Sequence, residues 1–179
     1  AKRLSFATEL AKRQKMVCPD THFGHGDAFF ELWSVWRDDA LAPARLHVVA
    51  LTDRAPHWTE LSNAGAEYPE LHQALENLLC IADDARLTLT LCVGERLKLL
   101  REQAFVADTV LLDTTPSGQR QPWDVWQSKA LARLCRPGTG LVAKGLSPDD
   151  QHSLRQCGFR LDAEQNVGTY APHWTMKRS

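Results

Sequence analysis

The strongest constraint on the fold is a repeated alternation of short apolar segments with longer segments that have helical spacing. Residues 45–51 (RLHVVAL) are almost continuously apolar, which is typical of a strand buried on both faces of a parallel sheet. Before them, Phe29, Leu32, Trp33 and Trp36 recur at helical spacing, so we place them in a helix core. Strands that alternate with helices of ten or more residues predict βαβ units and a parallel sheet.

The alternation continues along the chain and predicts one domain. We expect a doubly wound, mainly parallel α/β sheet over residues 15–179, preceded by a basic segment at 1–14. The expected strands lie at 15–19, 45–51, 86–93, 109–112, 140–143, 159–161 and about 169–177. The expected helices follow the first glycine turn and lie at 58–79 (divided at Pro69), 95–103, 123–135 and 147–158, the last with Ser147 as its N-cap.

Composition and charge exclude several classes of protein. A chain of 179 residues with 44% hydrophobic and 24% charged residues has the composition of one globular domain. No apolar run approaches the ~18 residues that a membrane span needs, and five scattered cysteines form no CxxC pair. We therefore expect a cytoplasmic protein with free thiols and no membrane partner. The net charge of −1 argues against a generic nucleic-acid binder, and the basic segment is either a solvated helix face or a phosphate-contacting arm.

Glycine and polar residues follow each expected strand at the point where it ends. In open α/β sheets, ligands bind outside the carboxyl ends of the strands, near the point where the strand order reverses. A glycine turn lets a ligand approach the backbone, and acidic groups accept hydrogen bonds from ribose hydroxyls or an adenine amino group. The pattern predicts a nucleoside cofactor, although the FGHG sequence also fits a plain strand-to-helix turn. The residues concerned are Asp20, Gly24, Gly26, Thr52, Asp53, Gly94, Glu95 and Asp113.

A metal site is the alternative for the first glycine turn. Cys18, His22, His25 and Asp27 supply metal-ligand atoms, but a glycine turn directs its side chains apart, and no second ligand pair follows at zinc-finger spacing. We therefore predict no metal. The chain also has no GxSxG nucleophile elbow and no Walker loop.

Several blocks of sequence resemble a known family. From about Val17 onward, the chain is similar to the methyltransferase domain of the bifunctional enzyme that makes 5-methylaminomethyl-2-thiouridine in tRNA. This resemblance implies a Rossmann-like sheet of the class I methyltransferase type, S-adenosylmethionine as cofactor, and an amine of the tRNA wobble uridine as methyl acceptor. The blocks are FGHGDAFFELWSVW, RLHVVAL, YPELHQAL, RLTLTLCVGE, VLLDTTP, Pro122-Trp123, ALARLCRPGTGLVA and LRQCGFRL.

The family's motifs assign roles to individual residues. Its acid-x-Gly-Phe-Gly-x-Gly motif falls on residues 20–26, with His22 in place of the first glycine. Its acid after the second strand falls on Thr52 beside Asp53, and its Gly-Asp pair becomes Gly94-Glu95. The resemblance thus implies the following cofactor-binding residues: Asp20, His22, Gly24, Gly26, Thr52, Asp53, Gly94 and Glu95.

The family's Asp-Gly-Phe-Ala-Pro motif becomes Asp113-Thr114-Thr115-Pro116. We assign Asp113 to positioning or deprotonating an acceptor amine, the alternative being a turn or N-cap aspartate. Thr114, Thr115 and Trp123 are assigned to the substrate, with Trp123 either stacking on a base or lying in the core.

A second functional hypothesis remains beside the enzyme. The changes at the cofactor and acceptor motifs also fit a methyltransferase-like protein that has lost catalysis and binds a protein partner as a scaffold. His22 separates the two hypotheses, because a bulky side chain stands where a cofactor would lie against bare backbone.

Overall fold

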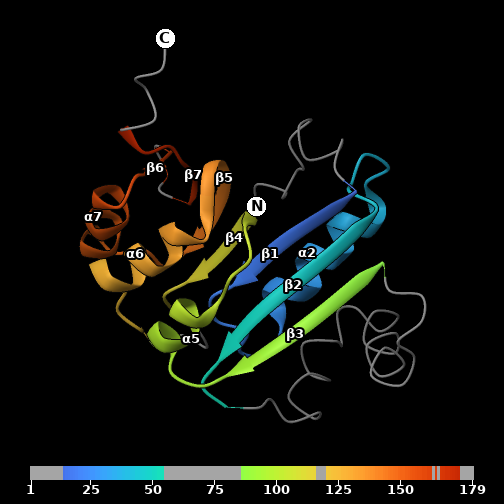
Figure 1. Cartoon of the computed structure of the whole chain (residues 1–179), viewed down its shortest axis with the longest axis horizontal. Coiled ribbons are helices and arrows are strands. Elements are labelled where there is room, and N and C mark those ends of the chain that lie inside the picture. The colour runs from blue at the N-terminus through green and yellow to red at the C-terminus, as the bar shows by residue number, and fades with distance from the viewer. Residues whose placement is uncertain (1–13, 55–85, 116–119, 163, 165, 174–179) are drawn as a thin grey trace.

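The fold is built on a single mixed sheet of seven strands. The computed structural model describes residues 14–54, 86–115, 120–162, 164 and 166–173. The strand order is β3-β2-β1-β4-β5-β7-β6, and β7 runs antiparallel to both β5 and β6 while the other pairs are parallel (Figure 1). The strands are β1 (Lys15–Asp20), β2 (Arg45–Thr52), β3 (Leu87–Val93), β4 (Ala107–Asp113), β5 (Cys135–Lys144), β6 (Phe159–Leu161) and β7 (Val167–Tyr170).

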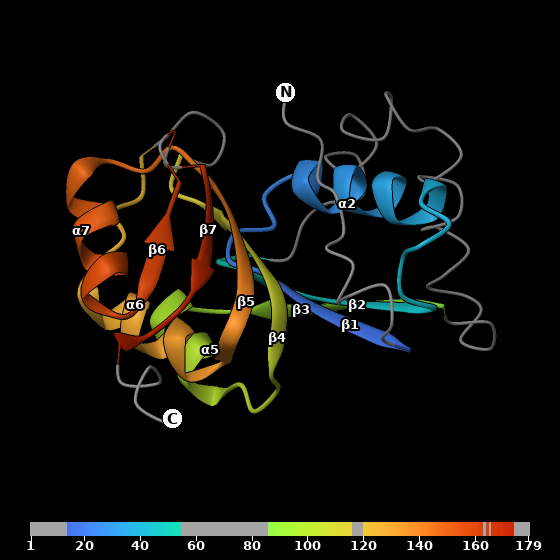
Figure 2. The same cartoon turned by 90° about the horizontal axis from the view of Figure 1, so that it is seen from above.

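The described helices cover both faces of this sheet, which confirms the doubly wound prediction. The helix α2 lies on one face, and α5, α6 and α7 lie on the other (Figure 2). From β1 the chain proceeds outward in one direction through β2 and β3, and then in the other through β4 and β5, so the strand order reverses between β1 and β4. The helices are α2 (Asp27–Asp38), α5 (Arg96–Glu102), α6 (Val125–Arg133) and α7 (Pro148–Gln156).

Two hydrophobic cores lie on the opposite faces of the sheet. The first core packs α2 against β1 and β2, and it contains the predicted Trp33 and Trp36, which are both buried. The indole nitrogen of Trp36 also donates a hydrogen bond to the carbonyl oxygen of Pro43 at 2.7 Å. Leu46, Val48, Leu111 and Leu134 are also buried, whereas Leu89 on the edge strand β3 is only partly buried.

Helix caps explain where α6 and α7 begin. Ser147 caps α7 with Pro148 in the first turn, as the sequence predicts, and Asp150 completes a capping box. The helix expected at 123–135 instead begins at Val125, because Asp124 is its N-cap and pairs with Gln127 in a second capping box. The sequence pattern located the helix but missed this cap.

The strands near the C-terminus differ from the prediction. The expected strand 140–143 is part of the longer β5, because Cys135 already pairs with Ala107 of β4 before the register shifts. The last strand begins two residues before the expected 169 and ends at Tyr170, where its pairing with β6 stops. The expected helix 58–79 lies outside the described residues, as does the basic segment 1–14 except for its last residue. Among the helices of the described residues, none has the length and apolar character needed to cross a membrane.

Candidate functional site

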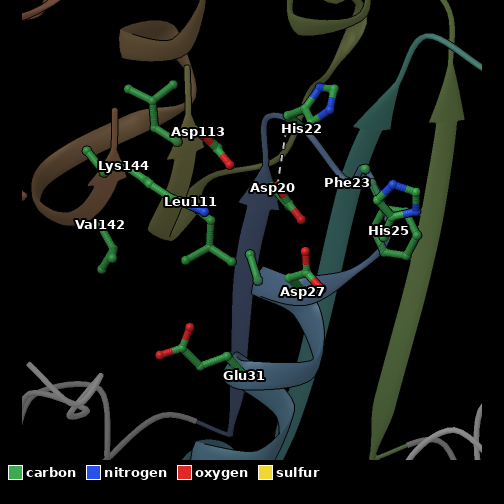
Figure 3. Close-up of a pocket in the computed structure, with 14 residues that line it drawn as sticks. Asp20, His22, Phe23, His25, Asp27, Glu31, Leu111, Asp113, Val142 and Lys144 are labelled. Carbon is green, nitrogen blue, oxygen red and sulfur yellow. Dashed lines mark hydrogen bonds between the residues drawn. The ribbon is translucent and has the colours of Figure 1, made fainter. Parts of the chain in front are cut away.

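Two hollows lie at the carboxyl ends of the central strands, where the strand order reverses. The first, which we call the carboxylate hollow, lies between the start of α2 and the ends of β1, β4 and β5 (Figure 3). The second, the Arg96 hollow, lies at the ends of β2 and β3 beside the start of α5. Each has a volume of about 200 Å³, and His22 lines both of them. The carboxylate hollow includes Asp20, Gly24, Asp27, Glu31, Asp113 and Lys144, and the Arg96 hollow includes Thr21, Thr52, Asp53, Gly94, Glu95, Arg96 and Gln121.

The glycine turn connects β1 to α2. Gly24 has a φ of 53° and Gly26 a φ of 87°, both in the left-handed region that glycine favours. Gly26 does not line either hollow. It is the N-cap of α2, and a Cβ there would meet Phe30 at 3.1 Å and Phe23 at 3.3 Å. The structure therefore gives Gly26 a role in starting the helix, and its contact with a cofactor stays a prediction.

His22 stands over the backbone of the turn. A Cβ added to Gly24 would lie 3.5 Å from both Cδ2 and Nε2 of the His22 ring, so the ring covers the peptide surface that the family's glycine would leave bare. Burial, followed by repulsion from the Arg96 guanidinium, lowers the pKa of His22, which favours a neutral ring near pH 7. The ring thus adds bulk without charge at the boundary between the two hollows.

Asp20 is the most unusual titratable group of the site. Its side chain is only 1% exposed, and its Oδ1 accepts a hydrogen bond from the backbone N–H of His22 at 3.1 Å. Its Oδ2 is buried and has no hydrogen-bond partner among the described residues. Burial raises the pKa of Asp20 to about 7, the His22 N–H opposes that rise, and the negative charge of Asp113 adds to it.

Asp113 lies at the carboxyl end of β4 and lines the same hollow as Gly24, as the sequence predicts. Its Oδ1 accepts hydrogen bonds from the backbone N–H and the hydroxyl of Thr115, at 2.7 and 3.2 Å. Asp113 therefore also shapes the turn that follows β4, which was the alternative reading of this residue. In Figure 3 the carboxyl groups of Asp20, Asp27 and Asp113 point toward a common space.

Arg96 is a site residue that sequence reasoning missed. Its guanidinium group lies 5.7 Å from the centroid of the Trp123 ring and donates to the side-chain oxygen of Gln121. Its Nη1 is buried and has no hydrogen-bond partner in the part of the chain that the structure describes. The sequence signal for Arg96 is a cation directly after the Gly94-Glu95 pair, which the family resemblance assigns to the cofactor.

Two predicted cofactor residues of the Arg96 hollow have their polar atoms engaged elsewhere. Glu95 caps α5, because its two carboxylate oxygens accept hydrogen bonds from the N–H groups of Leu97 and Lys98, both at 2.8 Å. Those two bonds lower the pKa of Glu95. The hydroxyl of Thr52 donates to the carbonyl oxygen of Arg54 at 2.6 Å. Asp53 is exposed at the rim of the hollow and is better placed than Thr52 or Glu95 to accept a hydrogen bond from a ligand.

The predicted substrate residues lie mostly inside the protein. Trp123 is 2% exposed in the second core, and its indole N–H donates to the hydroxyl of Ser128 at 2.9 Å, so stacking of its ring on a base is the wrong prediction. Thr114 is fully buried, and its hydroxyl donates to the carbonyl oxygen of Gly145 at 2.7 Å. Thr115 is half-buried and bonds to Asp113. Burial thus leaves neither Trp123 nor Thr114 available to a substrate.

Within the described residues, no group of three or more histidine, cysteine, aspartate or glutamate side chains is arranged to hold a metal ion. Cys18, one of the four residues considered for such a site, is fully buried beneath Asp20 on β1, and burial raises the pKa of its thiol.

Sequence comparison relates the chain to one group of curated proteins. It is 35% identical over 192 residues to the tRNA 5-methylaminomethyl-2-thiouridine biosynthesis bifunctional protein MnmC of Albidiferax ferrireducens, which covers 89% of this chain and 32% of that protein. It is 32% identical over 182 residues to the MnmC protein of Polaromonas naphthalenivorans, with 89% and 28% covered. The chain thus spans about a third of the length of these relatives. No family model matches it.

Structure comparison finds the same fold. MnmC2 from Aquifex aeolicus superposes with a TM-score of 0.65 at 19% identity, over 90% of this chain and 54% of that one. An O-methyltransferase family protein from Burkholderia thailandensis superposes with a TM-score of 0.52 at 12% identity, over 94% and 54% of the two chains. At these identities the superpositions establish the fold alone.

Proposed function

We propose that this chain, which is similar to part of the MnmC proteins and has the fold of the class I methyltransferases, transfers a methyl group from S-adenosylmethionine to an amine of a modified tRNA base. The observation that carries the proposal is the shared hollow of Gly24 and Asp113, at the place where open α/β sheets bind ligands. The relatives are named for the biosynthesis of 5-methylaminomethyl-2-thiouridine in tRNA, which supports a modified uridine of tRNA as the substrate class. The same sequence similarity favours tRNA as the macromolecular partner.

The two hollows fit the two halves of such a cofactor. A pocket for a ligand of this size typically measures ~300–1,000 Å³, so neither hollow suffices alone, whereas both together do. The carboxylate hollow, with the unpartnered oxygen of Asp20, suits a positively charged sulfur centre. The Arg96 hollow offers Asp53 as an acceptor and Arg96 and Gln121 as polar partners for a nucleoside.

Individual residues of the carboxylate hollow can be given separate roles in methyl transfer. When bound, S-adenosylmethionine supplies an activated methyl group, and the protein must align the acceptor, exclude water and remove a proton from the acceptor amine. Asp113 is placed to orient that amine and to hold its proton at a carboxylate oxygen. Asp20 lies beside it, close enough for the charge of Asp113 to raise its pKa.

His22 supports a second candidate function, a methyltransferase-like binding protein without catalysis. Its ring covers the Gly24 backbone and stands at the boundary of the two hollows, where an extended ligand must pass. If the ring keeps this position, the hollows stay separate and each takes only a smaller ligand. The enzyme hypothesis requires the ring to turn aside when the cofactor enters.

A titration with S-adenosylmethionine, followed by melting curves, tests cofactor binding. A ligand at 100 times its dissociation constant stabilises a fold by ~2.7 kcal/mol, which shifts the melting temperature measurably. We expect the wild type to be stabilised and His22→Gly to bind about tenfold more tightly, because the variant need not displace the ring; tenfold corresponds to ~1.4 kcal/mol.

The control is His152→Gly, which removes a histidine from the exposed side of α7, outside both hollows. It should bind the cofactor as the wild type does. Absence of any shift in the wild type together with a clear shift in His22→Gly would show that the ring closes the site and favour the binding-protein hypothesis. Absence of a shift in all three proteins at millimolar ligand would refute the proposed cofactor.

A further inference from the structure

Trp126 is an exposed tryptophan on α6, and the packing of that helix explains its position. It is 55% exposed and is the aromatic residue among the large exposed hydrophobic residues of the described ranges. Leu131 of the same helix is fully buried in the second core. A helix turns by about 100° per residue, so Trp126 lies roughly 140° around α6 from Leu131. Burying Leu131 therefore turns Trp126 toward solvent.

Basic side chains share this exposed side of the helical layer. Lys129 and Arg133 follow Trp126 at three and seven residues, the spacing of neighbours along one side of a helix. The Nζ of Lys129 lies 4.6 Å from the centroid of the Trp126 ring, within the range of a cation–π interaction. On α5, Lys98 is exposed and lies roughly 160° around the helix from the buried Leu100. Each helix therefore directs a lysine away from the sheet.

The helices α5 and α6 lie side by side on the same face of the sheet (Figure 1). Arg133 joins them, because its guanidinium donates hydrogen bonds to carbonyl oxygens at the end of α5, including those of Leu100 at 3.0 Å and Gln103 at 2.7 Å. This contact holds the basic side chains of the two helices next to one another. We call their exposed sides the α5–α6 surface, and its residues are Lys98, Arg101, Trp126, Lys129 and Arg133.

The α5–α6 surface is basic in a chain whose net charge is −1. Two acidic residues lie on the same helices or their caps, and both have partners. Glu102 lies 3.9 Å from the Nζ of Lys98, and Asp124 accepts a hydrogen bond from the backbone N–H of Gln127 at 2.8 Å. Four basic residues against these two acids leave the surface positively charged, so it attracts a polyanion.

The surface begins beside the Arg96 hollow. Arg96 is the first residue of α5, and Gln121 lies in the segment that leads into α6. Trp126 is in the first turn of α6, so its ring and the hollow lie toward the same end of the helical pair. A nucleotide chain that crosses the surface near Trp126 can therefore reach the hollows.

We propose that the α5–α6 surface docks the unpaired RNA strand that flanks the methyl acceptor, with Trp126 stacking on a base and Lys98 and Lys129 contacting phosphates. The inference rests on the proposed function, which supplies RNA as the partner. Single-stranded nucleic acids are bound by this combination of aromatic rings and cations. A base stacked on Trp126 also fixes the position of the acceptor relative to the hollows.

A protein partner fits the surface less well than RNA does. Lysine is depleted at protein–protein interfaces, and its strongly hydrated ammonium group is costly to bury. The side chain of Lys98 is 73% exposed. In an RNA complex such an ammonium group stays at the surface beside a phosphate, and the RNA releases a counterion. The lysines therefore favour a polyanion over a protein.

Binding of a fluorescein-labelled RNA stem-loop with an unpaired loop, followed by anisotropy, tests the role of Trp126. We expect Trp126→Ala to bind about tenfold more weakly than the wild type, because one stacking contact is lost. Trp126→Phe keeps an aromatic face and should stay within about threefold of the wild type. The control is Leu41→Ala, which removes an apolar side chain that is 67% exposed between α2 and β2. It should bind as the wild type does.

Salt dependence tests the lysines separately. Removing one phosphate contact lowers the slope of log affinity against log salt concentration by about 0.7 for a single strand. We expect this change for Lys98→Gln and for Lys129→Gln, whereas Trp126→Ala should keep the wild-type slope. Arg45→Gln is the matched control, because Arg45 is exposed at the start of β2, at the end of the sheet opposite the hollows.

Methyl-transfer kinetics separate this inference from the proposed function. Trp126→Ala should raise the KM for tRNA about tenfold and leave kcat unchanged. RNA affinity and salt slope that stay unchanged in Trp126→Ala and in both lysine variants would overturn the proposal. A change of oligomeric state in Trp126→Ala with unchanged RNA affinity would also overturn it, since the surface would then be a protein interface. A wild type that binds RNA through these residues and transfers no methyl group would support the surface and refute the proposed function.

Discussion

Replacing Asp113 with asparagine is expected to lower methyl-transfer turnover by ~10²–10⁴-fold, the usual loss when an acid–base group is removed. Asparagine can still accept the hydrogen bonds that Thr115 donates to Oδ1, so the turn after β4 should keep its shape. The variant loses the negative charge that orients an acceptor amine and holds its proton. The melting temperature should therefore change little, while turnover falls.

The measurement compares initial rates of methyl transfer with melting curves for both proteins. Asp149→Asn is the matched control, because Asp149 is an exposed aspartate in the first turn of α7 and lines neither hollow. Its turnover should equal that of the wild type. Full activity in Asp113→Asn would show that Asp113 only forms the turn, which is the alternative that its contacts with Thr115 also support.

Truncating Trp123 to alanine should destabilise the fold by ~3–5 kcal/mol, which is a large part of the stability of a typical domain. The ring is 2% exposed in the core beneath α5, α6 and α7, and its loss leaves a cavity there. The hydroxyl of Ser128 also loses the indole N–H as its partner. We expect denaturant unfolding to report this loss directly.

Trp126→Ala is the control for this truncation, because that tryptophan is 55% exposed on α6, with Lys129 4.6 Å from its ring centroid. Its removal should cost at most ~1 kcal/mol. If Trp123→Ala instead kept its stability and lost affinity for tRNA, the ring would contact the substrate and the assignment to the core would be wrong.

The sequence predicted the layers of the fold well because burial on two faces leaves a clear pattern. Residues 45–51 are almost continuously apolar because β2 lies inside the sheet, between β1 and β3. Ser147 and Pro148 marked the start of α7 because capping depends on local hydrogen bonds. The length of β5 was missed, since its first residues pair with β4 across a register shift that no local pattern encodes.

The site was predictable in outline and less so in its contacts. Chain order alone placed Asp20 and Asp113 at the ends of β1 and β4, where they share a hollow. Whether a polar group faces a ligand depends on its other partners, which sequence does not show. The carboxylate of Glu95 accepts hydrogen bonds from the first N–H groups of α5. The indole N–H of Trp123 donates a hydrogen bond to Ser128 inside the core. Arg96 was overlooked because its place beside Gln121 depends on a loop 25 residues further along the chain.

Transfer of a labelled methyl group from S-adenosylmethionine to undermodified bulk tRNA tests the central claim most directly. We expect label to enter tRNA only when the protein is present, on an amine of a modified uridine, and we expect fully modified tRNA to take up none. The contradicting result is a protein that binds S-adenosylmethionine, as its melting curve reports, and yet transfers no label to any tRNA. That outcome would identify the chain as a binding protein that keeps the class I methyltransferase fold without its reaction.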